Sequence, residues 1–148
     1  MVFSKRSRYG IRALIVLAQN ARNGSIQLNE IADRSSISVK YLEQIFSALR
    51  KAGIIRSIKG SQGGYFLAIP SGHLTVAEII VALDGIYFLE REEVQDGGKG
   101  ETEARVVQTE IIEPLNEWID RFLNALTLKE LVKCSEKYRD VLQDMYYI

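Results

Sequence analysis

The segment LNEIADRSSISVKYLEQI, residues 28–45, decides the fold of this chain. Its apolar positions have the spacing of two short helices that cross closely and are joined by a turn. These positions are Ile31, Ala32, Ile37, Leu42 and Ile45. Ala32 is small, as such a crossing requires, whereas Ser36 stands in the turn where many motifs of this kind have glycine. Ser38 is placed to cap the second helix. The segment therefore predicts a helix-turn-helix, which inserts the start of its second helix into the major groove of DNA.

The residues on either side of this segment predict a further helix and a hairpin. Residues 6–21 have apolar side chains at helical spacing, and Gly24 follows as a stop. Residues 54–58 and 65–69 have the pattern of strands, and the glycine-rich residues 59–64 between them are typical of a turn. Because a strand rather than a helix follows these glycines, they do not indicate a phosphate-binding loop. Three helices followed by a hairpin are the order of a winged helix-turn-helix.

The second half of the chain predicts three more helices. Residues 75–78 form a capping box that opens a fourth helix, and residues 127–130 form another that opens a short sixth helix. Between them, residues 104–126 predict a long fifth helix, in which Pro114 either kinks the helix or marks its true start. Residues 90–103, with six acidic residues and three glycines, predict an exposed, mobile loop. The expected fold class is mostly α with a small β-hairpin: a winged helix-turn-helix plus a long dimerisation helix.

The composition is that of a globular protein and excludes several classes. With 148 residues, 47% of them hydrophobic, the chain forms one domain or one domain plus a dimerisation element. It has one cysteine, Cys134, and one histidine, His73. These are too few for a zinc site of Cys and His ligands or for the usual pairs of nucleophile and base, so we expect no metal site and no enzyme. No apolar run approaches the roughly 18 residues of a membrane span and no signal peptide is evident, so we expect a cytoplasmic protein without a membrane partner.

Charge divides the chain into two halves. Residues 1–74 have eleven Lys or Arg and three acidic residues, a net charge of +8. Residues 75–148 have eight Lys or Arg and sixteen acidic residues, a net charge of −8. A basic half next to an acidic half suggests that one half binds a polyanion, although charge alone leaves a merely solvated basic surface as an equal alternative. We predict that residues 1–74 bind DNA and that residues 75–148 dimerise and receive the signal.

The side chains that face outward in this arrangement suit contacts to DNA. On the third helix they are Ser38, Lys40, Glu43, Gln44 and Ser47; on the wing, Arg56 and Lys59; at the start of the first helix, Lys5, Arg6, Ser7 and Arg8. Glutamine can pair with adenine, glutamate can accept from cytosine, and lysine can bind phosphate or guanine. Other roles stay open, because Glu43 can equally pair with Lys40 or Arg50 on the surface and Ser38 can be a cap alone. Three other basic residues of this half are assigned to solvated surface: Arg12, Arg22 and Arg34.

The predicted helix at residues 104–126 has an apolar stripe wider than one small domain needs to cover. The central members of the stripe are Ile112, Leu115, Trp118, Ile119 and Phe122. We predict that they hold a homodimer, and a symmetric dimer implies a palindromic operator in double-stranded DNA. The alternative is that Trp118 and Phe122 fill the core of their own protomer.

Several short motifs together make the chain similar to a known family. They are Arg-Tyr-Gly at residues 8–10, Tyr-Leu-Glu-Gln at 41–44, Leu-Arg-Lys-Ala-Gly at 49–53, Lys-Gly-Ser-Gln-Gly-Gly-Tyr at 59–65 and Thr-Leu at 127–128. On these motifs the chain resembles the Rrf2 family of bacterial transcription regulators over nearly its whole length. The resemblance implies a dimeric winged-helix regulator whose long helix crosses to the partner subunit. It also implies base contacts at Ser38, Glu43 and Gln44 and a wing contact near Lys59.

Many Rrf2 regulators hold an iron–sulfur cluster with three cysteines in the loop after the fourth helix. Here that loop, residues 85–103, has no Cys and no His, so the resemblance to those members does not extend to the cluster and we expect no cofactor. The chain looks most like the cluster-free subgroup of CymR-type repressors of cysteine metabolism. Cys134 is either a small residue half packed beside the sixth helix or a redox thiol next to Lys133 and Lys137.

In that subgroup the regulator works with cysteine synthase, an enzyme that accepts peptides ending in isoleucine. The residues Tyr147-Ile148 resemble such a peptide, which makes cysteine synthase a candidate partner; the alternative is that this tail packs on its own dimer. A rival interpretation from another class is a winged-helix protein–protein interaction module without specific DNA binding. Salt-dependent binding to duplex DNA distinguishes the two, because phosphate contacts release counterions.

Overall fold

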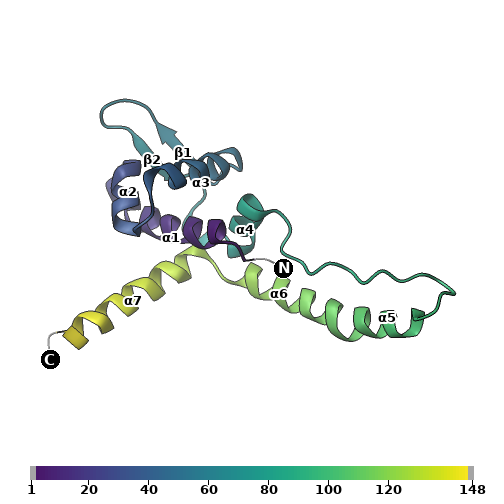
Figure 1. The fold of residues 1–148 in the computed structure, drawn as a ribbon. Coiled ribbons are helices and arrows are strands. Elements are labelled where there is room, and N and C mark those ends of the chain that lie inside the picture. Colours follow the sequence, from purple (N-terminus) through teal and green to yellow (C-terminus); the bar gives the residue numbers. More distant parts are fainter. Residues whose placement is uncertain (1–2, 147–148) are drawn as a thin grey trace.

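The computed structural model describes residues 3–146, so the candidate partner-binding tail, Tyr147 and Ile148, lies outside the described residues. The α-helices are α1 (Lys5–Gln19), α2 (Leu28–Ser35), α3 (Val39–Lys51), α4 (Val76–Asp84), α5 (Glu101–Val107), α6 (Glu113–Ala125) and α7 (Leu128–Tyr146). The remaining elements are the short turns η1 (Ala21–Asn23) and η2 (Ser71–His73), the π-helical turn η3 (Gln108–Ile112), and the strands β1 (Ile55–Ile58) and β2 (Gly64–Leu67). The expected class, mostly α with a small hairpin, is confirmed (Figure 1). No helix among residues 3–146 is both long and apolar enough to span a membrane.

Helices α1 to α3 and the hairpin pack around one apolar core. Its fully buried side chains include Leu14 and Leu17 of α1, Ile31 of α2, Leu42, Ile45, Phe46 and Leu49 of α3, and Ile55 of β1. The strands are antiparallel, with Ile55 opposite Leu67, and the Tyr65 ring meets the Phe46 ring edge-on at 4.9 Å between centroids. A two-stranded hairpin is marginal alone in water, so these contacts to α3 hold the wing in place.

The starts of α4 and α7 are joined to each other beside this core. The Val76 N–H donates to the Leu126 carbonyl at 2.9 Å, and the Leu128 N–H donates to the Leu74 carbonyl at 2.9 Å. Leu74 and Leu128 are themselves fully buried in the same core as α1 and α3. The apolar core therefore continues from the winged body into the first turns of α4 and α7.

The predicted long helix is a continuous run of α5, η3 and α6, named here the α5–α6 run (Figure 1). It begins at Glu101, a few residues earlier than expected. Pro114 is near the start of α6, directly after the π-helical turn. Proline has no N–H, and its ring clashes with the carbonyl four residues earlier in an α-helix, so a wider turn before it accommodates both. Pro114 thus lies in the first turn of α6, at the start of the regular α-helix that follows the π-helical turn.

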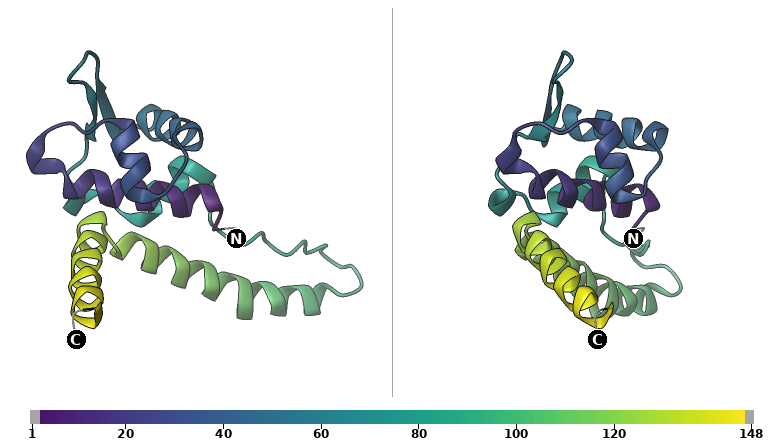
Figure 2. Two further views of the ribbon diagram at one scale, coloured as in Figure 1. Left: turned by 60° about the vertical axis from the view of Figure 1, so that its left-hand side comes forward. Right: turned by 90° about the vertical axis from the view of Figure 1, so that its left-hand side faces the viewer.

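Helix α7 is longer than predicted. Both predicted capping boxes are confirmed, because Thr75 and Thr127 exchange hydrogen bonds with Glu78 and Glu130, respectively. The helix that Thr127 opens has 19 residues, so the prediction of a short helix is wrong. Residues 128–146 contain no glycine or proline that would end the helix, and apolar side chains recur along it to Tyr146. Figure 2 shows α7 and the α5–α6 run leaving the winged body from a common corner in different directions.

The acidic loop between α4 and α5 is exposed over most of its length, as predicted. Its first half is hydrogen-bonded to the α5–α6 run. The Leu89 N–H donates to Asn116 Oδ1 at 2.7 Å, and the Leu89 carbonyl accepts from Asn116 Nδ2 at 3.2 Å. Three residues later, the Glu92 N–H donates to Gln108 Oε1 at 2.8 Å. The loop therefore lies along the helix, and its mobility stays a prediction.

Candidate nucleic-acid interface

The turn between α2 and α3 fixes where α3 begins. Ser36 has a φ of 54°, in the left-handed region that favours glycine, which explains why glycine is common at this position in similar motifs. The next residue, Ile37, is buried, and its N–H donates to the Ala32 carbonyl at 3.1 Å. Ser38 then caps α3, as predicted, since its hydroxyl accepts from the Tyr41 N–H at 3.3 Å. These contacts leave the first turn of α3 facing solvent.

Nine of the eleven residues predicted to contact DNA are exposed, whereas Arg6 is half-buried and Ser7 is buried. The exposed set consists of Lys5, Arg8, Ser38, Lys40, Glu43, Gln44, Ser47, Arg56 and Lys59. Glu43 forms no ion pair among the described residues, so its predicted alternative as a partner of Lys40 or Arg50 is absent from the structure. Its carboxylate is therefore free to accept hydrogen bonds. The contacts of the whole set with DNA remain predictions.

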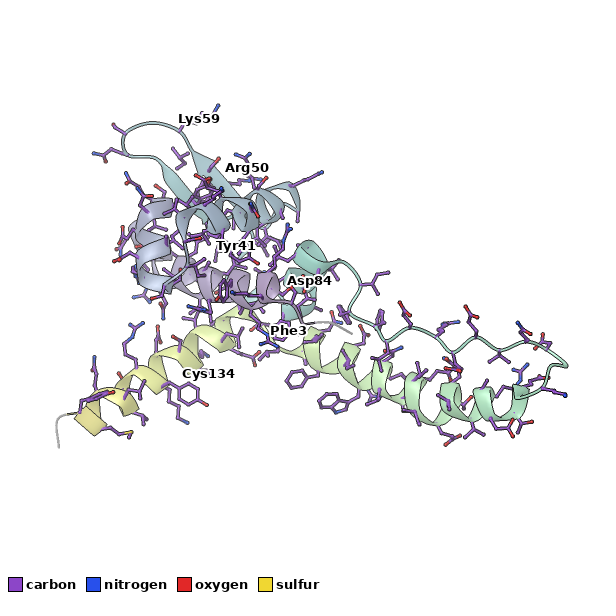
Figure 3. The ribbon with its side chains drawn as sticks, in the orientation of Figure 1. Phe3, Tyr41, Arg50, Lys59, Asp84 and Cys134 are labelled. Atoms are coloured by element: carbon purple, nitrogen blue, oxygen red, sulfur yellow. The ribbon has the colours of Figure 1, made fainter. Side chains whose placement is uncertain are left out.

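The wing places Lys59 at its tip, beyond Arg50 at the end of α3 (Figure 3). The tip is tight because a side chain at Gly63 would lie 2.2 Å from the Ile58 carbonyl oxygen, and Gly60 has a φ of 114°. The glycines of residues 60–64 were predicted to serve a hairpin turn with positive φ; the turn is observed, and of the three glycines Gly60 has a positive φ. Lys59 is thus held on a short, defined loop.

The first turn of α1 contains both exposed and buried residues. Lys5 and Arg8 are exposed; Lys5 Nζ lies 5.3 Å from the centre of the Tyr9 ring, and Arg8 Nε donates to the Phe3 carbonyl at 3.1 Å. Ser7, which was also predicted to clamp phosphate, is fully buried. That prediction is wrong, because a hydroxyl without exposed surface cannot reach a phosphate.

Arg12 makes contacts between helices that the sequence analysis did not predict. It was assigned to solvated surface, but its guanidinium donates to the Ser35 carbonyl and lies 4.7 Å from the centre of the Tyr9 ring. The Tyr9 ring in turn meets Tyr41 edge-on, with 5.7 Å between centroids. Arg12 therefore joins α1 to the carbonyl end of α2, just before the turn that positions α3. The sequence did contain a signal for the contact with Tyr9: the two residues are three positions apart, and side chains at this spacing are neighbours on a helix surface.

A second exposed surface lies on α6, away from the wing. Trp118 is 62% exposed and Phe122 is 51% exposed, and their rings are stacked at 5.4 Å between centroids. The alternative that these two rings fill the core of their own protomer is therefore wrong. Leu115 is exposed as well, whereas Ile112 and Ile119 are half-buried. Three of the five members of the predicted dimerisation set thus form an apolar surface that the chain itself does not cover.

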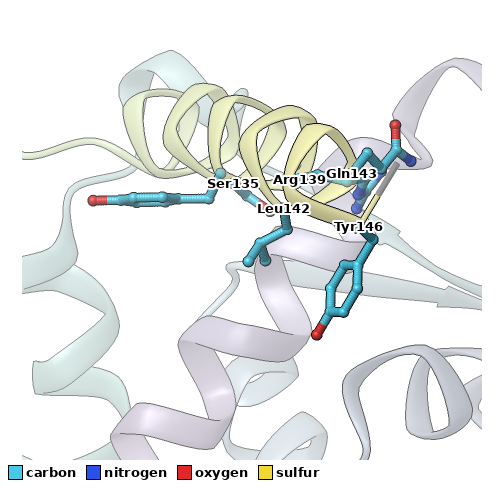
Figure 4. A pocket seen from close by; sticks show the side chains of 6 residues that line it. Ser135, Arg139, Leu142, Gln143 and Tyr146 are labelled. Atoms are coloured by element: carbon cyan, nitrogen blue, oxygen red, sulfur yellow. The ribbon is translucent and has the colours of Figure 1, made fainter. Parts of the chain in front are cut away.

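Helix α7 carries an open hollow of about 640 Å³ along its second half. It is lined by Ser135, Tyr138, Arg139, Leu142, Gln143 and Tyr146, and Leu142 and Tyr146 project to the same side of the helix (Figure 4). Cys134 is on the same helix and is exposed, so the prediction that it is half packed is wrong. Among residues 3–146, no group of three or more His, Cys, Asp or Glu side chains is placed to hold a metal ion.

An exposed recognition helix, a basic wing and a separate apolar helix surface together define a winged helix-turn-helix regulator. The Rrf2 family profile, described as an iron-dependent transcriptional regulator, matches residues 3–134. The transcriptional regulator IscR of Xenorhabdus nematophila is 36% identical over 136 residues, which cover 92% of this chain and 82% of IscR. The chain therefore belongs to the Rrf2 family of transcriptional regulators.

Two solved structures share both the fold and part of the sequence. CymR, described as the global cysteine regulator of B. subtilis, aligns with a TM-score of 0.74 and 30% identity over 90% of this chain and 97% of CymR. IscR of T. potens aligns with a TM-score of 0.72 and 32% identity over 93% of this chain and 90% of IscR. The resemblance to the Rrf2 family that the motifs indicated is confirmed.

Proposed function

We propose that the protein is a homodimeric repressor that binds a palindromic operator through residues 1–74. The observation that supports this most directly is the exposure of nine of the eleven predicted side chains, which lie on α1, α3 and the wing. Figure 1 shows α3 and the wing on the side of the molecule opposite to α6 and α7. Residues 75–148 would then dimerise and receive the signal without obstructing the DNA-binding surface. We place this regulator in the cytoplasm.

Operator binding can be tested by recovering bound fragments from genomic DNA and titrating them with the protein at several salt concentrations. A repressor that neutralises phosphates should lose affinity linearly with the logarithm of salt concentration. A winged helix that binds protein instead would show no steep salt dependence on duplex DNA. The common sequence of the fragments should contain two half-sites about one helical turn apart, or a multiple of one turn.

We also propose that the regulator acts without an iron–sulfur cluster. The family profile is described as iron-dependent, but the loop at residues 85–103 has no cysteine, and the one cysteine of the chain is exposed on α7. Clusters of this kind require thiolate or histidine ligands close together. Protein purified without oxygen should be colourless, and iron should leave its DNA binding unchanged. A brown protein with stoichiometric iron and sulfide would contradict the proposal.

Control of cysteine metabolism is the regulatory task we propose, with cysteine synthase as the partner. The similarity to CymR supports the first part. For the second, the support is that α7 projects from the winged body and that Tyr146 at its end is 85% exposed. A pocket with backbone donors can capture a short chain terminus by its carboxylate.

The enzyme should be titrated with the full chain and with a chain that lacks Tyr147 and Ile148. Loss of affinity on truncation would support the tail as the contact. Equal affinity would remove the tail from the mechanism and favour its packing on its own dimer. No affinity in either case would remove the enzyme and leave Cys134 oxidation or a small molecule as the signal.

A further inference from the structure

Asp84, the last residue of α4, contacts the start of α1. Its Oδ2 accepts from the Ser7 hydroxyl at 2.6 Å and from the Ser4 N–H at 3.2 Å, and its Oδ1 accepts from the Ser4 hydroxyl. Ser4 is also the N-cap of α1, because its hydroxyl accepts from the Ser7 N–H at 3.1 Å. One carboxylate therefore joins the last turn of one helix to the first turn of another, at the position labelled in Figure 3.

The charge of Asp84 is unfavourable for its own helix and favourable for α1. A carboxylate at a helix C-terminus faces the negative end of the helix dipole, whereas the N-terminus of α1 attracts it. Burial raises the pKa of Asp84, but hydrogen bonds from Ser4 and Ser7 outweigh burial and hold the pKa below its usual value. Ser7 is 0% exposed, so its hydroxyl would lose its hydrogen-bond partner without Asp84. The contact between α4 and α1 is thus specific and costly to remove.

The same region connects to α3 through close packing. A Cβ atom at Gly10 would lie 2.3 Å from Leu83 Cδ1 of α4 and 3.4 Å from Ile45 Cγ2 of α3. Three helices therefore meet closely at Gly10, where a larger residue would force Leu83 to move. One residue earlier, Tyr9 contacts Tyr41 in the first turn of α3. A displacement of the end of α4 relative to α1 would consequently be transmitted to the start of α3.

On its other side, Asp84 leads directly into the acidic loop. Gly85 ends α4 with a φ of 82°, and the loop then reaches α6 through the paired hydrogen bonds between Leu89 and Asn116. Asp84 thus lies between the start of α1 and the loop that leads to the proposed dimerisation helix.

We propose that Asp84 is a positioning residue for operator binding, which holds the first turn of α1 and thereby α3 in the orientation that fits DNA. The proposal rests on the DNA-binding function proposed above. In the free protein the contact fixes the positions of Lys5 and Arg8 relative to the first turn of α3. A signal that shifts the loop would reach the DNA-binding surface through this carboxylate.

The decisive variant is Asp84→Asn, which keeps the shape of the side chain but removes the charge and one acceptor. If Asp84 acted only through its negative charge, its removal would strengthen binding to DNA phosphates. If Asp84 is a positioning residue, the substitution should weaken operator binding instead. We expect the affinity to fall about tenfold at constant salt, which is within the usual range of coupling between two sites. Asp144→Asn is the matched control, because Asp144 is exposed on α7 and undergoes the same charge change. It should leave affinity unchanged.

Two further measurements separate positioning from a general loss of structure. Hydrogen exchange at the Ser7 and Arg8 amides should become faster in Asp84→Asn without DNA present, while sedimentation still shows a dimer. Ser7→Ala should weaken operator binding as well, and the double variant should be no weaker than Asp84→Asn alone, because both remove one interaction.

A folded, dimeric Asp84→Asn protein that binds the operator as tightly as the wild type, or more tightly, would overturn the proposal. If Asp84→Asn does not fold, Ser7→Ala decides: wild-type affinity and wild-type exchange would then overturn it. A wild-type protein that binds no DNA would instead overturn the proposed function itself, so the two failures are distinguishable.

Discussion

Helices α3 and α6 both have 13 residues and an apolar stripe, but the chain covers only one of the two stripes. In α3 the whole stripe is buried, namely Leu42, Ile45, Phe46 and Leu49. In α6 the one buried residue is Leu123, and Trp118 and Phe122 remain largely exposed. The same pattern of amphipathic helix therefore has two outcomes. In α3 the polar face is left free, whereas in α6 the apolar face is left free.

This difference separates the two proposed tasks. A free polar face with Lys, Glu and Gln side chains suits hydrogen bonds to base edges and phosphates. A free apolar face with stacked aromatic rings suits a protein partner, since aromatic residues dominate the energy of interfaces. We therefore expect substitutions in α6 to act on assembly first and substitutions on the outer face of α3 to act on DNA binding alone.

The largest effect should come from the double substitution Trp118→Ala with Phe122→Ala. Two buried aromatic residues at the centre of an interface contribute roughly 5 kcal/mol together, enough to separate a dimer at micromolar concentration. Sedimentation should show monomers, and binding to the operator should be lost with the dimer. Ile58→Ala, which removes another exposed apolar side chain, is the control and should stay dimeric. A double variant that stays dimeric would move the interface elsewhere.

Substitutions in the buried stripe of α3 should lower the stability of the fold rather than change the dimerisation. Phe46 is fully buried and packs against Tyr65, so Phe46→Ala should lower the free energy of unfolding by about 3–5 kcal/mol. Trp118→Ala, measured where the protein is monomeric, should lower it by much less, because the ring is exposed in the protomer. Denaturant titration of both variants compares the two helices directly. Similar losses would contradict the difference between the stripes.

The outer face of α3 should determine sequence preference. Gln44→Ala or Glu43→Ala should cost about 1–3 kcal/mol at particular base pairs and relax the preference there. The measurement is competition between the recovered operator and duplexes with single base changes. A uniform loss over all duplexes would indicate that these residues contact the backbone instead.

Substitution of the wing residue should have the smallest effect on DNA binding, and the effect should not depend on the DNA sequence. Lys59→Ala should weaken binding by a similar factor for all sequences and reduce the slope of log affinity against log salt by about 1, if Lys59 contacts one phosphate. Titrations at several salt concentrations check this. An unchanged slope would place the tip of the wing away from the DNA.

The sequence predicted the parts of the molecule that short-range patterns determine. The cap at Ser38 and the two capping boxes depend on residues three positions apart, and all are observed. The buried stripe of α3 follows from helical periodicity. The exposed Trp118 and Phe122 were selected because no single small domain could cover so wide a stripe.

The parts that could not be predicted depend on contacts between distant residues. The hydrogen bonds of Asp84 to Ser4 and Ser7 join positions about eighty residues apart, and the contact of Arg12 with Ser35 needs the packing of α1 on α2. The length of α7 was underestimated because most of its side chains after Leu128 are exposed and no stop signal marks its end. Neither tertiary packing nor an exposed helix without a stop signal is visible in local sequence.

The central claim, that α3 and the wing bind an operator as part of a dimer held by α6, is tested most directly by one titration. Duplex DNA recovered from the genome is titrated with the wild type and with the Trp118→Ala, Phe122→Ala variant over a range of salt concentrations. The wild type should bind with a steep linear loss of log affinity against log salt, and the monomeric variant should bind far more weakly. Salt-insensitive binding by the wild type, or equal binding by a monomeric variant, would contradict the claim.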